Sequence, residues 1–204
     1  MTRKRKVRKP ARNMKYPFRK LVLPVALQKQ INGRLDKSLL ARVNTGGKMF
    51  TTAAFAFNTM YDEAKKVGIT LRNIGDYRSF EGQLEMFNDR YSLKDEGRKP
   101  QVTRQYEGKT WFLKKGKAPS AAPDPTGKRG SNHGWGLAID LAVEDKKGQI
   151  LALSSDKKAL KWMCENAPRY GFFMQTADPK SPEFEAWHWQ YCYGDEFPPA
   201  FVPA

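Results

Sequence analysis

The sequence is poor in the residues that form disulfides and metal sites, with only two cysteines and two histidines among its 204 residues. Cys164 and Cys192 form no Cys-x-x-Cys pair and neither lies beside a histidine, so the pattern favours neither a disulfide framework nor a thiolate zinc site. We expect two buried free thiols, with one disulfide as the alternative. Free thiols fit synthesis in a reducing cytoplasm.

Long apolar runs are also missing. The run from Leu21 to Leu27 has seven residues and contains Pro24, whereas a membrane-spanning helix needs about twenty. The run follows a basic segment, as the core of a signal peptide would, but no Ala-x-Ala-like cleavage site comes after it. We therefore expect synthesis in the cytoplasm without a signal peptide, so that action on any extracellular target would depend on release by another agent.

Acidic residues are absent from positions 1–20, which carry ten Lys or Arg residues. The formal net charge of +16 therefore falls to +6 over residues 21–204, which hold 27 basic and 21 acidic residues. We expect a disordered tail over residues 1–20 and a single domain over residues 21–204. The tail is either a solvated arm or a binding segment for polyanions, which include nucleic acid, anionic lipid and the phosphate-bearing anionic polymers of a bacterial wall.

Both histidines lie near a carboxylate in the sequence. His133 comes shortly before Asp140, and His188 follows Glu185 by three positions. Imidazole and carboxylate groups bind zinc, and three protein ligands with one open position are typical of a catalytic zinc site. Residues 137–143 alternate as a strand does, which puts Asp140 on the face with two alanines and leaves room beside it.

A second alternating segment, residues 186–191, predicts another strand. It places Trp187, Trp189 and Tyr191 on one face and His188 with Gln190 on the other. Two alternatives to a metal site remain: Glu-x-x-His is common by chance, and a buried Asp can pair with Arg or Lys instead of a metal ion. The use of both histidines in such contexts, after a glycine-rich bend, favours a metal site.

Three motifs carry a resemblance to a known family. The patterns Ser131-x-His133-x-x-Gly136-x-Ala138-x-Asp140 and Glu185-x-Trp187-His188 resemble the signatures of the LAS group of zinc metallopeptidases, in its D-alanyl-D-alanine carboxypeptidase and dipeptidase branch. A third element, the aromatic-Arg-Ser turn followed by Gln, is similar to residues 77–83. The chain most resembles phage-encoded members that attack peptidoglycan.

The resemblance implies a role for each motif residue. His133, Asp140 and His188 would bind Zn²⁺, Glu185 would be the general base, and Arg78 would contact the substrate carbonyl. Substrate binding is further expected at Tyr77, Gln83 and Ser131. Asp76 departs from the family, which more often has a small residue there, and this leaves open the shape and charge of that edge of the substrate site.

The fold expected is α+β, a small and mostly antiparallel sheet that carries the zinc site and packs against helices, as in hedgehog and DD-peptidase domains. Apolar periodicity predicts helices over residues 50–66, 80–91 and 156–167, and a strand over residues 69–74. Residues 92–130 are rich in Lys, Gly and Pro, with a hairpin expected around residues 108–115. This stretch is either a lid beside the site or mobile surface.

The function expected from the resemblance is zinc-dependent hydrolysis of peptide bonds in peptidoglycan stem peptides, by a carboxypeptidase or an endopeptidase of a phage lysis system or virion. One alternative is a non-catalytic zinc-containing wall-binding module, since the LAS group includes hedgehog domains. Glu185 argues against that alternative. A nucleic-acid-binding protein, suggested by the basic tail, is the less favoured third reading.

Overall fold

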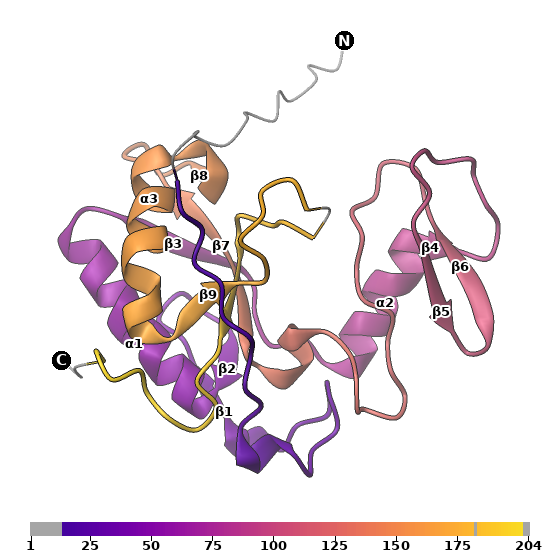
Figure 1. Cartoon of the computed structure of the whole chain (residues 1–204), viewed down its shortest axis with the longest axis horizontal. Helices are drawn as coiled ribbons and strands as arrows, with labels where there is room; N and C mark the ends of the chain where they lie inside the picture. Colours follow the sequence, from indigo (N-terminus) through magenta and orange to yellow (C-terminus); the bar gives the residue numbers. More distant parts are fainter. Residues whose placement is uncertain (1–13, 182, 202–204) are drawn as a thin grey trace.

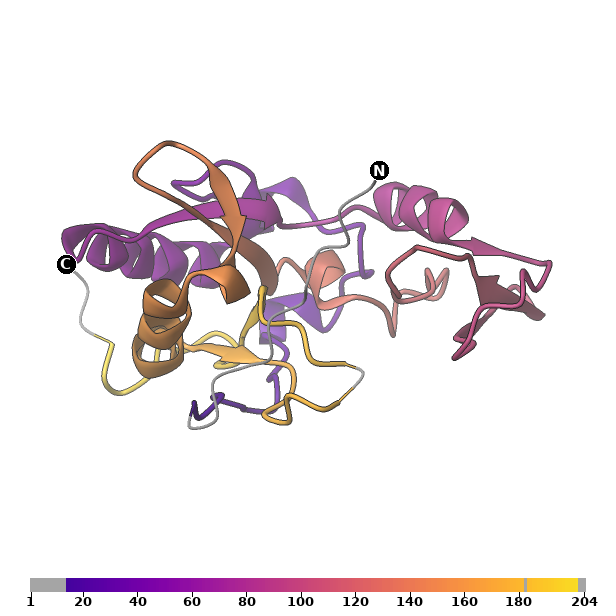
Figure 2. The same ribbon diagram turned by 90° about the horizontal axis from the view of Figure 1, so that it is seen from above.

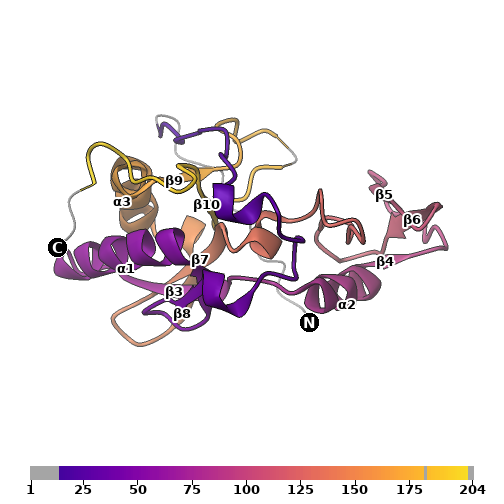
Figure 3. The same cartoon turned by 90° about the horizontal axis from the view of Figure 1, so that it is seen from below.

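The computed structural model describes residues 14–181 and 183–201, and shows a larger body beside a smaller lobe (Figure 1). The lobe stands to one side of the body in the views from above (Figure 2) and from below (Figure 3). Residues on both parts contribute to one cleft, described below, so the placement of the lobe matters for function.

The body is built on an antiparallel sheet with the strand order β3-β7-β10-β9, in which β8 also pairs with β7. Its strands are β3 (Thr70–Gly75), β7 (Ala138–Glu144), β8 (Ile150–Ala152), β9 (Phe172–Met174) and β10 (His188–Tyr191). The central strand β7 is almost entirely buried, as its apolar sequence requires. This arrangement confirms the α+β fold with a small antiparallel sheet.

Two helices supply the core that supports the sheet. Helix α1 (Thr51–Lys66) buries a stripe of alanine and aromatic side chains at helical spacing, including Phe57 and Met60. Helix α3 (Lys157–Asn166) begins at Asp156, whose side chain accepts a hydrogen bond from the Ala159 N–H, and buries Leu160 and Met163. A short hairpin of β1 (Leu40–Arg42) and β2 (Lys48–Phe50) leads into α1.

Five 3₁₀ helices complete the elements of the described residues. They are η1 (Val25–Leu27), η2 (Lys37–Leu39), η3 (Asn132–Trp135), η4 (Leu153–Ser155) and η5 (Ala167–Tyr170). Pro168 lies in the first turn of η5, so the α-helix that precedes it ends at Asn166, as the proline predicts.

The smaller lobe has an apolar cluster of its own. Helix α2 (Phe80–Arg90) packs on a three-stranded sheet of β4 (Tyr91–Ser92), β6 (Lys109–Leu113) and β5 (Thr103–Tyr106). The buried members of the cluster are Phe87, Tyr91, Tyr106 and Leu113. The stretch read from the sequence as a lid or as mobile surface therefore contains ordered strands.

The predicted hairpin is present in this lobe, but it begins earlier than expected. Its turn is Glu107-Gly108, where both residues have positive φ (50° and 69°), and its first strand starts at Thr103. This two-residue turn matches the twist of paired strands, which explains why Glu107 tolerates the left-handed region.

The predicted disordered tail is wrong for residues 14–20, whereas residues 1–13 lie outside the described residues. Tyr16 is buried and its ring lies edge-on to Phe184, with ring centroids 4.8 Å apart. The Pro17 carbonyl accepts a hydrogen bond of 2.9 Å from the Met174 N–H. Tyr16 thus attaches this basic segment to the body through an apolar contact, whereas the Phe18 side chain is exposed.

Other expectations are confirmed. The three predicted helices and the strand over residues 69–74 appear within one or two residues of their expected bounds. Cys164 and Cys192 are both free and buried. Within residues 14–181 and 183–201, no helix has the length and hydropathy needed to cross a membrane.

Candidate active site

His133 is presented by a short turn that its own motif encodes. The Ser131 hydroxyl oxygen accepts a hydrogen bond from the His133 N–H and caps η3, and Gly136 ends the turn with a φ of 65°. A Cβ atom at Gly136 would lie only 2.7 Å from the Phe50 backbone nitrogen. Gly136 is therefore required both for its backbone conformation and for this close approach.

Asp140 lies in the middle of the sheet with strands on both sides. Across one edge of β7 it is the direct register partner of His188 on β10. Across the other edge it pairs with Gly75, where the register of β3 shifts after Asn73. A Cβ atom at Gly75 would lie 2.8 Å from Oδ2 of Asp140. The missing side chain leaves space for the carboxylate.

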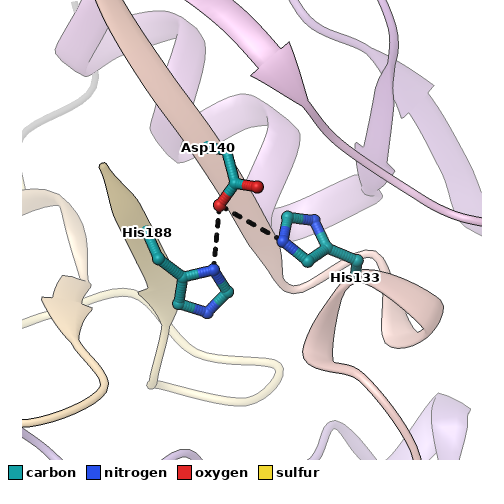
Figure 4. A group of neighbouring side chains, drawn as sticks. All are labelled: His133, Asp140 and His188. Carbon is teal, nitrogen blue, oxygen red and sulfur yellow. Dashed lines mark hydrogen bonds and ion pairs between the residues drawn. The ribbon is translucent and has the colours of Figure 1, made fainter. Parts of the chain in front are cut away.

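Both imidazole rings face the same carboxylate oxygen, as Figure 4 shows. The Oδ1 atom of Asp140 lies 2.9 Å from Nδ1 of His188 and 3.3 Å from Nε2 of His133. One ligand atom from each residue can be chosen so that all lie within 4.8 Å of one another. The structure thus brings the three predicted ligands together.

The environment of His133 fits metal binding. Its Nδ1–H donates a hydrogen bond of 2.9 Å to the Asp76 backbone carbonyl, which fixes the ring. In the neutral ring, Nε2 then carries a lone pair aimed at an anionic oxygen, a contact that calls for a proton or a cation between the two atoms. Metal-binding histidines commonly donate their outer N–H to a carbonyl in this way.

His188 and Asp140 also fit a cation. The Nε2 atom of His188 is buried without a hydrogen-bond partner in the described part of the chain. Burial alone would raise the pKa of the Asp140 carboxyl, but the interactions of this carboxyl with the neighbouring imidazoles of His133 and His188 outweigh burial and hold this pKa well below the ordinary value. The carboxylate is therefore anionic at neutral pH. Two imidazoles and one carboxylate form a donor set that zinc accepts.

Glu185 lines the same cleft and differs from Asp140 in its affinity for a proton. Burial raises the pKa of its carboxyl above the ordinary value, and the charge of Asp140 adds to this effect. His188, Arg90 and Arg78 act in the opposite direction without cancelling it. Two carboxyl groups with opposite pKa shifts in one cleft can take different roles, one as a ligand and one as a proton acceptor.

Arg78 reaches the cleft from the turn between β3 and α2. Burial lowers the pKa of its guanidinium, which nevertheless stays charged at neutral pH because arginine titrates so high. Its Nη1 donates a hydrogen bond of 3.0 Å to Oε1 of Gln83, and its backbone N–H donates to the His133 carbonyl. The arginine is thus tied to the metal-ligand turn.

The cleft has a volume of about 520 Å³, which suits a peptide-sized ligand. Of the predicted site residues, it is lined by Arg78, Ser131, His133, Asp140, Glu185 and His188. Neither Gln83 nor Tyr77 is among the lining residues. Gln83 is buried between Arg78 and the Ala121 carbonyl, and the Tyr77 hydroxyl accepts a hydrogen bond from the Leu35 N–H.

Asp76 does not line the cleft either. Its side chain accepts a hydrogen bond from the Lys48 N–H at the start of β2, and its carbonyl holds His133. The departure from the family pattern therefore puts a carboxylate against the β1–β2 hairpin.

The predicted orientation of Trp187 is wrong. Trp189 and Tyr191 are fully buried in the core, but Trp187 is 38 % exposed and lines the cleft. Ala186 and Trp187 form a turn closed by a hydrogen bond from the His188 N–H to the Glu185 carbonyl, so the alternation of the strand begins only at His188.

Sequence reasoning missed several residues of the cleft wall. Arg90 ends α2 and Arg104 lies in β5, and both reach the cleft from the smaller lobe together with residues 118–122. Glu183 lines the cleft from the body. No motif marks these residues, because their approach to the site depends on where the lobe lies.

Comparisons with known proteins show similarity to carboxypeptidases. The family model described as VanY, D-alanyl-D-alanine carboxypeptidase, matches residues 47–195. A Bacillus subtilis (strain 168) protein named "Putative carboxypeptidase YodJ" is 30% identical over 143 residues, which is 68% of this chain and 44% of that protein. The chain thus spans less than half the length of this curated relative.

Solved structures share the fold. The LdcB LD-carboxypeptidase is 25% identical with a TM-score of 0.55, over 81% of this chain and 76% of that chain. VanYB in complex with D-Alanine-D-Alanine is 21% identical with a TM-score of 0.53, over 85% of each chain. A VanY D,D-pentapeptidase in complex with Zn(II) is 20% identical with a TM-score of 0.50, over 84% of this chain and 85% of that one.

Proposed function

Because the chain belongs to the VanY D-alanyl-D-alanine carboxypeptidase family, we propose that it is a zinc-dependent peptidase that hydrolyses peptide bonds in the stem peptides of peptidoglycan. The observation that carries this proposal is the convergence of His133, Asp140 and His188 in a cleft that also holds Glu185 and Arg78. A metal donor set, a proton acceptor and a cation in one cleft are the parts that metal-assisted hydrolysis needs.

Zinc would be held by His133, Asp140 and His188. The Zn(II) complex of the VanY D,D-pentapeptidase supports the choice of metal, and the buried imidazoles and the ionised carboxylate fit it. When bound, zinc polarises the scissile carbonyl and makes water a better nucleophile at neutral pH.

Glu185 would act as the general base. Its elevated pKa lets it accept a proton from the attacking water and return that proton to the leaving amine.

Arg78 would hold the substrate carbonyl as negative charge develops on its oxygen. Gln83 would orient Arg78 through the 3.0 Å hydrogen bond, acting from behind the cleft wall, and Tyr77 would support the Leu35 backbone in the same indirect way. The Ser131 hydroxyl oxygen accepts from the His133 N–H, which leaves its own hydrogen free to donate to a substrate. Substrate contact is thus proposed for Arg78 and Ser131.

The VanYB complex with D-Alanine-D-Alanine supports a substrate that ends in this dipeptide. Removal of a terminal residue is therefore our first proposal, with cleavage inside the stem as the alternative. The expectations of a phage lysis enzyme or virion component, action at the bacterial cell wall, and wall-polymer binding by the basic tail stay predictions. So does the assignment of residues 21–204 to one metallopeptidase domain.

The test is digestion of purified peptidoglycan and of a synthetic stem pentapeptide by the zinc-loaded protein and its Glu185→Gln variant, with mass spectrometry of the products. We expect loss of one D-alanine with the wild type, and at least about a 100-fold slower reaction with the variant, at unchanged zinc content. Glu165→Gln is the matched control, since this glutamate is exposed on α3 and outside the cleft. No release by the wild type would reject the proposed function.

A further inference from the structure

Two arginines of the smaller lobe form part of the cleft wall opposite the metal ligands' strands. Arg90 Nη1 donates a hydrogen bond of 3.1 Å to the Pro119 carbonyl, and Arg104 Nε donates one of 3.0 Å to the Ser120 carbonyl. Both side chains line the cleft next to residues 118–122. The two guanidinium groups are therefore held on neighbouring residues of one extended segment.

Among residues 14–181 and 183–201, these arginines have no acidic partner in an ion pair. Ion pairs occur elsewhere in the described residues, such as Arg72 with Glu144, but none involves Arg90 or Arg104. A guanidinium has five N–H donors in a fixed fork, and backbone carbonyls occupy only one donor of Arg90 and two of Arg104. Donors and charge of both residues thus remain available to a ligand.

The two arginines share the cleft with the reacting groups. Arg90 and Arg104 line the same cleft as Arg78 and Glu185. A neutral donor such as an amide would be enough to hold each of these two carbonyls. The hydrogen bonds to residues 118–122 therefore do not explain why both side chains are positively charged. A carboxylate is the acceptor whose planar, anionic shape matches the guanidinium fork.

We propose that Arg90 and Arg104 form a recognition subsite for a free carboxylate of the peptide substrate, separate from the carbonyl that is attacked. This inference rests on the proposed function and adds a specificity determinant to it. A stem peptide offers two sources of such a group: its terminal carboxylate, and the α-carboxylate of its γ-linked D-glutamyl residue. Both share the chemistry that the subsite would recognise.

The test compares three synthetic peptides: L-Ala-γ-D-Glu-L-Lys-D-Ala-D-Ala, its C-terminal amide, and its form amidated at the D-glutamyl α-carboxylate. Isothermal titration calorimetry measures the binding of each to the zinc-loaded protein with wild-type arginines, the Arg90→Gln/Arg104→Gln variant and an Arg42→Gln control, all carrying Glu185→Gln so that the peptides are not cleaved during the titration. Arg42 is exposed on β1 outside the cleft, and its substitution matches the change in charge of each single arginine substitution. The peptide whose amidation weakens binding identifies the carboxylate.

We expect one amidation to raise the Kd of the wild type and of the Arg42→Gln control by about tenfold, as for the loss of a charge-assisted hydrogen bond. In the double variant, the same amidation should change the Kd less than about twofold. Equal sensitivity of wild type and double variant to both amidations would overturn the inference. So would a double variant that binds all three peptides more weakly by the same factor, because the arginines would then only hold residues 118–122.

Two further measurements keep the result interpretable. Circular dichroism checks the fold of the double variant, and the single Arg90→Gln and Arg104→Gln variants replace it if it does not fold; each should lose part of the selectivity. Turnover of the parent peptide is followed in parallel with proteins that retain Glu185. Selective binding without turnover would reject the proposed function and keep the subsite, whereas turnover without selectivity would reject the subsite alone.

Discussion

Asp140 and His188 are direct partners across the antiparallel β7–β10 pair, and Oδ1 of the aspartate lies 2.9 Å from Nδ1 of the histidine. Two of the three proposed zinc ligands are therefore positioned by the backbone hydrogen bonds of the sheet. A rigid sheet holds ligands more precisely than a loop does. The third ligand, His133, comes from the turn that leads into the same strand.

Asp140→Asn should remove zinc while preserving the fold. The amide keeps the size of the side chain but lacks the negative charge that two imidazoles surround, so we expect zinc affinity to fall more than about 100-fold, beyond the effect of losing an outer-shell partner. Competition with a chelating dye measures the affinity. Asp145→Asn, in the turn after β7, is the control and should stay within about twofold. Equal affinities in the two variants would contradict the ligand assignment.

Gly75→Ala should disturb the proposed zinc site through the neighbouring strand β3. The new Cβ atom would lie 2.8 Å from Oδ2 of Asp140 and displace the carboxylate or the strand. We expect a loss of about 1–3 kcal/mol in the free energy of unfolding and a fall of about 10- to 100-fold in zinc affinity. Urea denaturation and chelator competition measure the two effects.

Gly82→Ala provides the contrast to the Gly75 substitution. This glycine lies within α2, and a Cβ atom there meets other atoms only at ordinary contact distances of 3.5 Å. Alanine should stabilise the helix by about 0.5–1 kcal/mol and leave zinc affinity unchanged. Similar zinc affinities for the two alanine variants would show that the space beside Asp140 is not critical.

Gln83→Ala should lower kcat/KM by about 10- to 100-fold, because the buried amide links Arg78 to the Ala121 carbonyl and a hydrogen bond to a charged group is lost. A double-mutant cycle with Arg78→Ala identifies a positioning role. In the Arg78→Ala background, Gln83→Ala should change kcat/KM by less than about threefold. Fully additive losses would instead indicate an independent contact of Gln83 with the substrate.

Both thiols should react slowly with thiol reagents in the folded protein. Burial raises the pKa of Cys164 to about 12, with a further contribution from the charge of Glu165, and burial raises the pKa of Cys192 to about 12 as well. Each group is therefore a protonated thiol at every pH below that value, and the thiolate is the reactive form. At pH 8 we expect reaction with a disulfide reagent to be at least about 100-fold slower than in guanidinium chloride. Two rapidly reacting native thiols would contradict the burial.

The proposed ligands could be found in the sequence because their residue types are rare. With only two histidines in the chain, their spacing to Asp140 and Glu185 was enough to draw attention to the residues that the structure brings together. The alternation of β7 likewise marked Asp140 as an anomaly within an apolar strand. Patterns of this kind depend only on residues that are close in the sequence, so they can be recognised without knowing the tertiary structure.

The rest of the site depends on contacts between distant segments. Arg90 and Arg104 are ordinary surface-type residues in the sequence, and they line the cleft only because the smaller lobe is placed beside the body. Trp187 was placed on the same face as Trp189 and Tyr191 by a strand pattern that begins two residues too early, since a turn precedes His188. Tyr16 was hidden by the many basic residues around it, although it is buried on the body.

The segment around Pro17 and Phe18 also protects the end of the sheet. Strand β9 is the last in the order β3-β7-β10-β9, and its outer side would present unpaired backbone groups. Phe18 forms a parallel bridge with Met174 there, and the Pro17 carbonyl accepts the Met174 N–H. A chain shortened to begin at residue 21 would expose this edge to the strands of other molecules. Self-association through β9, rather than a loss of zinc, is then the first defect to expect from such a truncation.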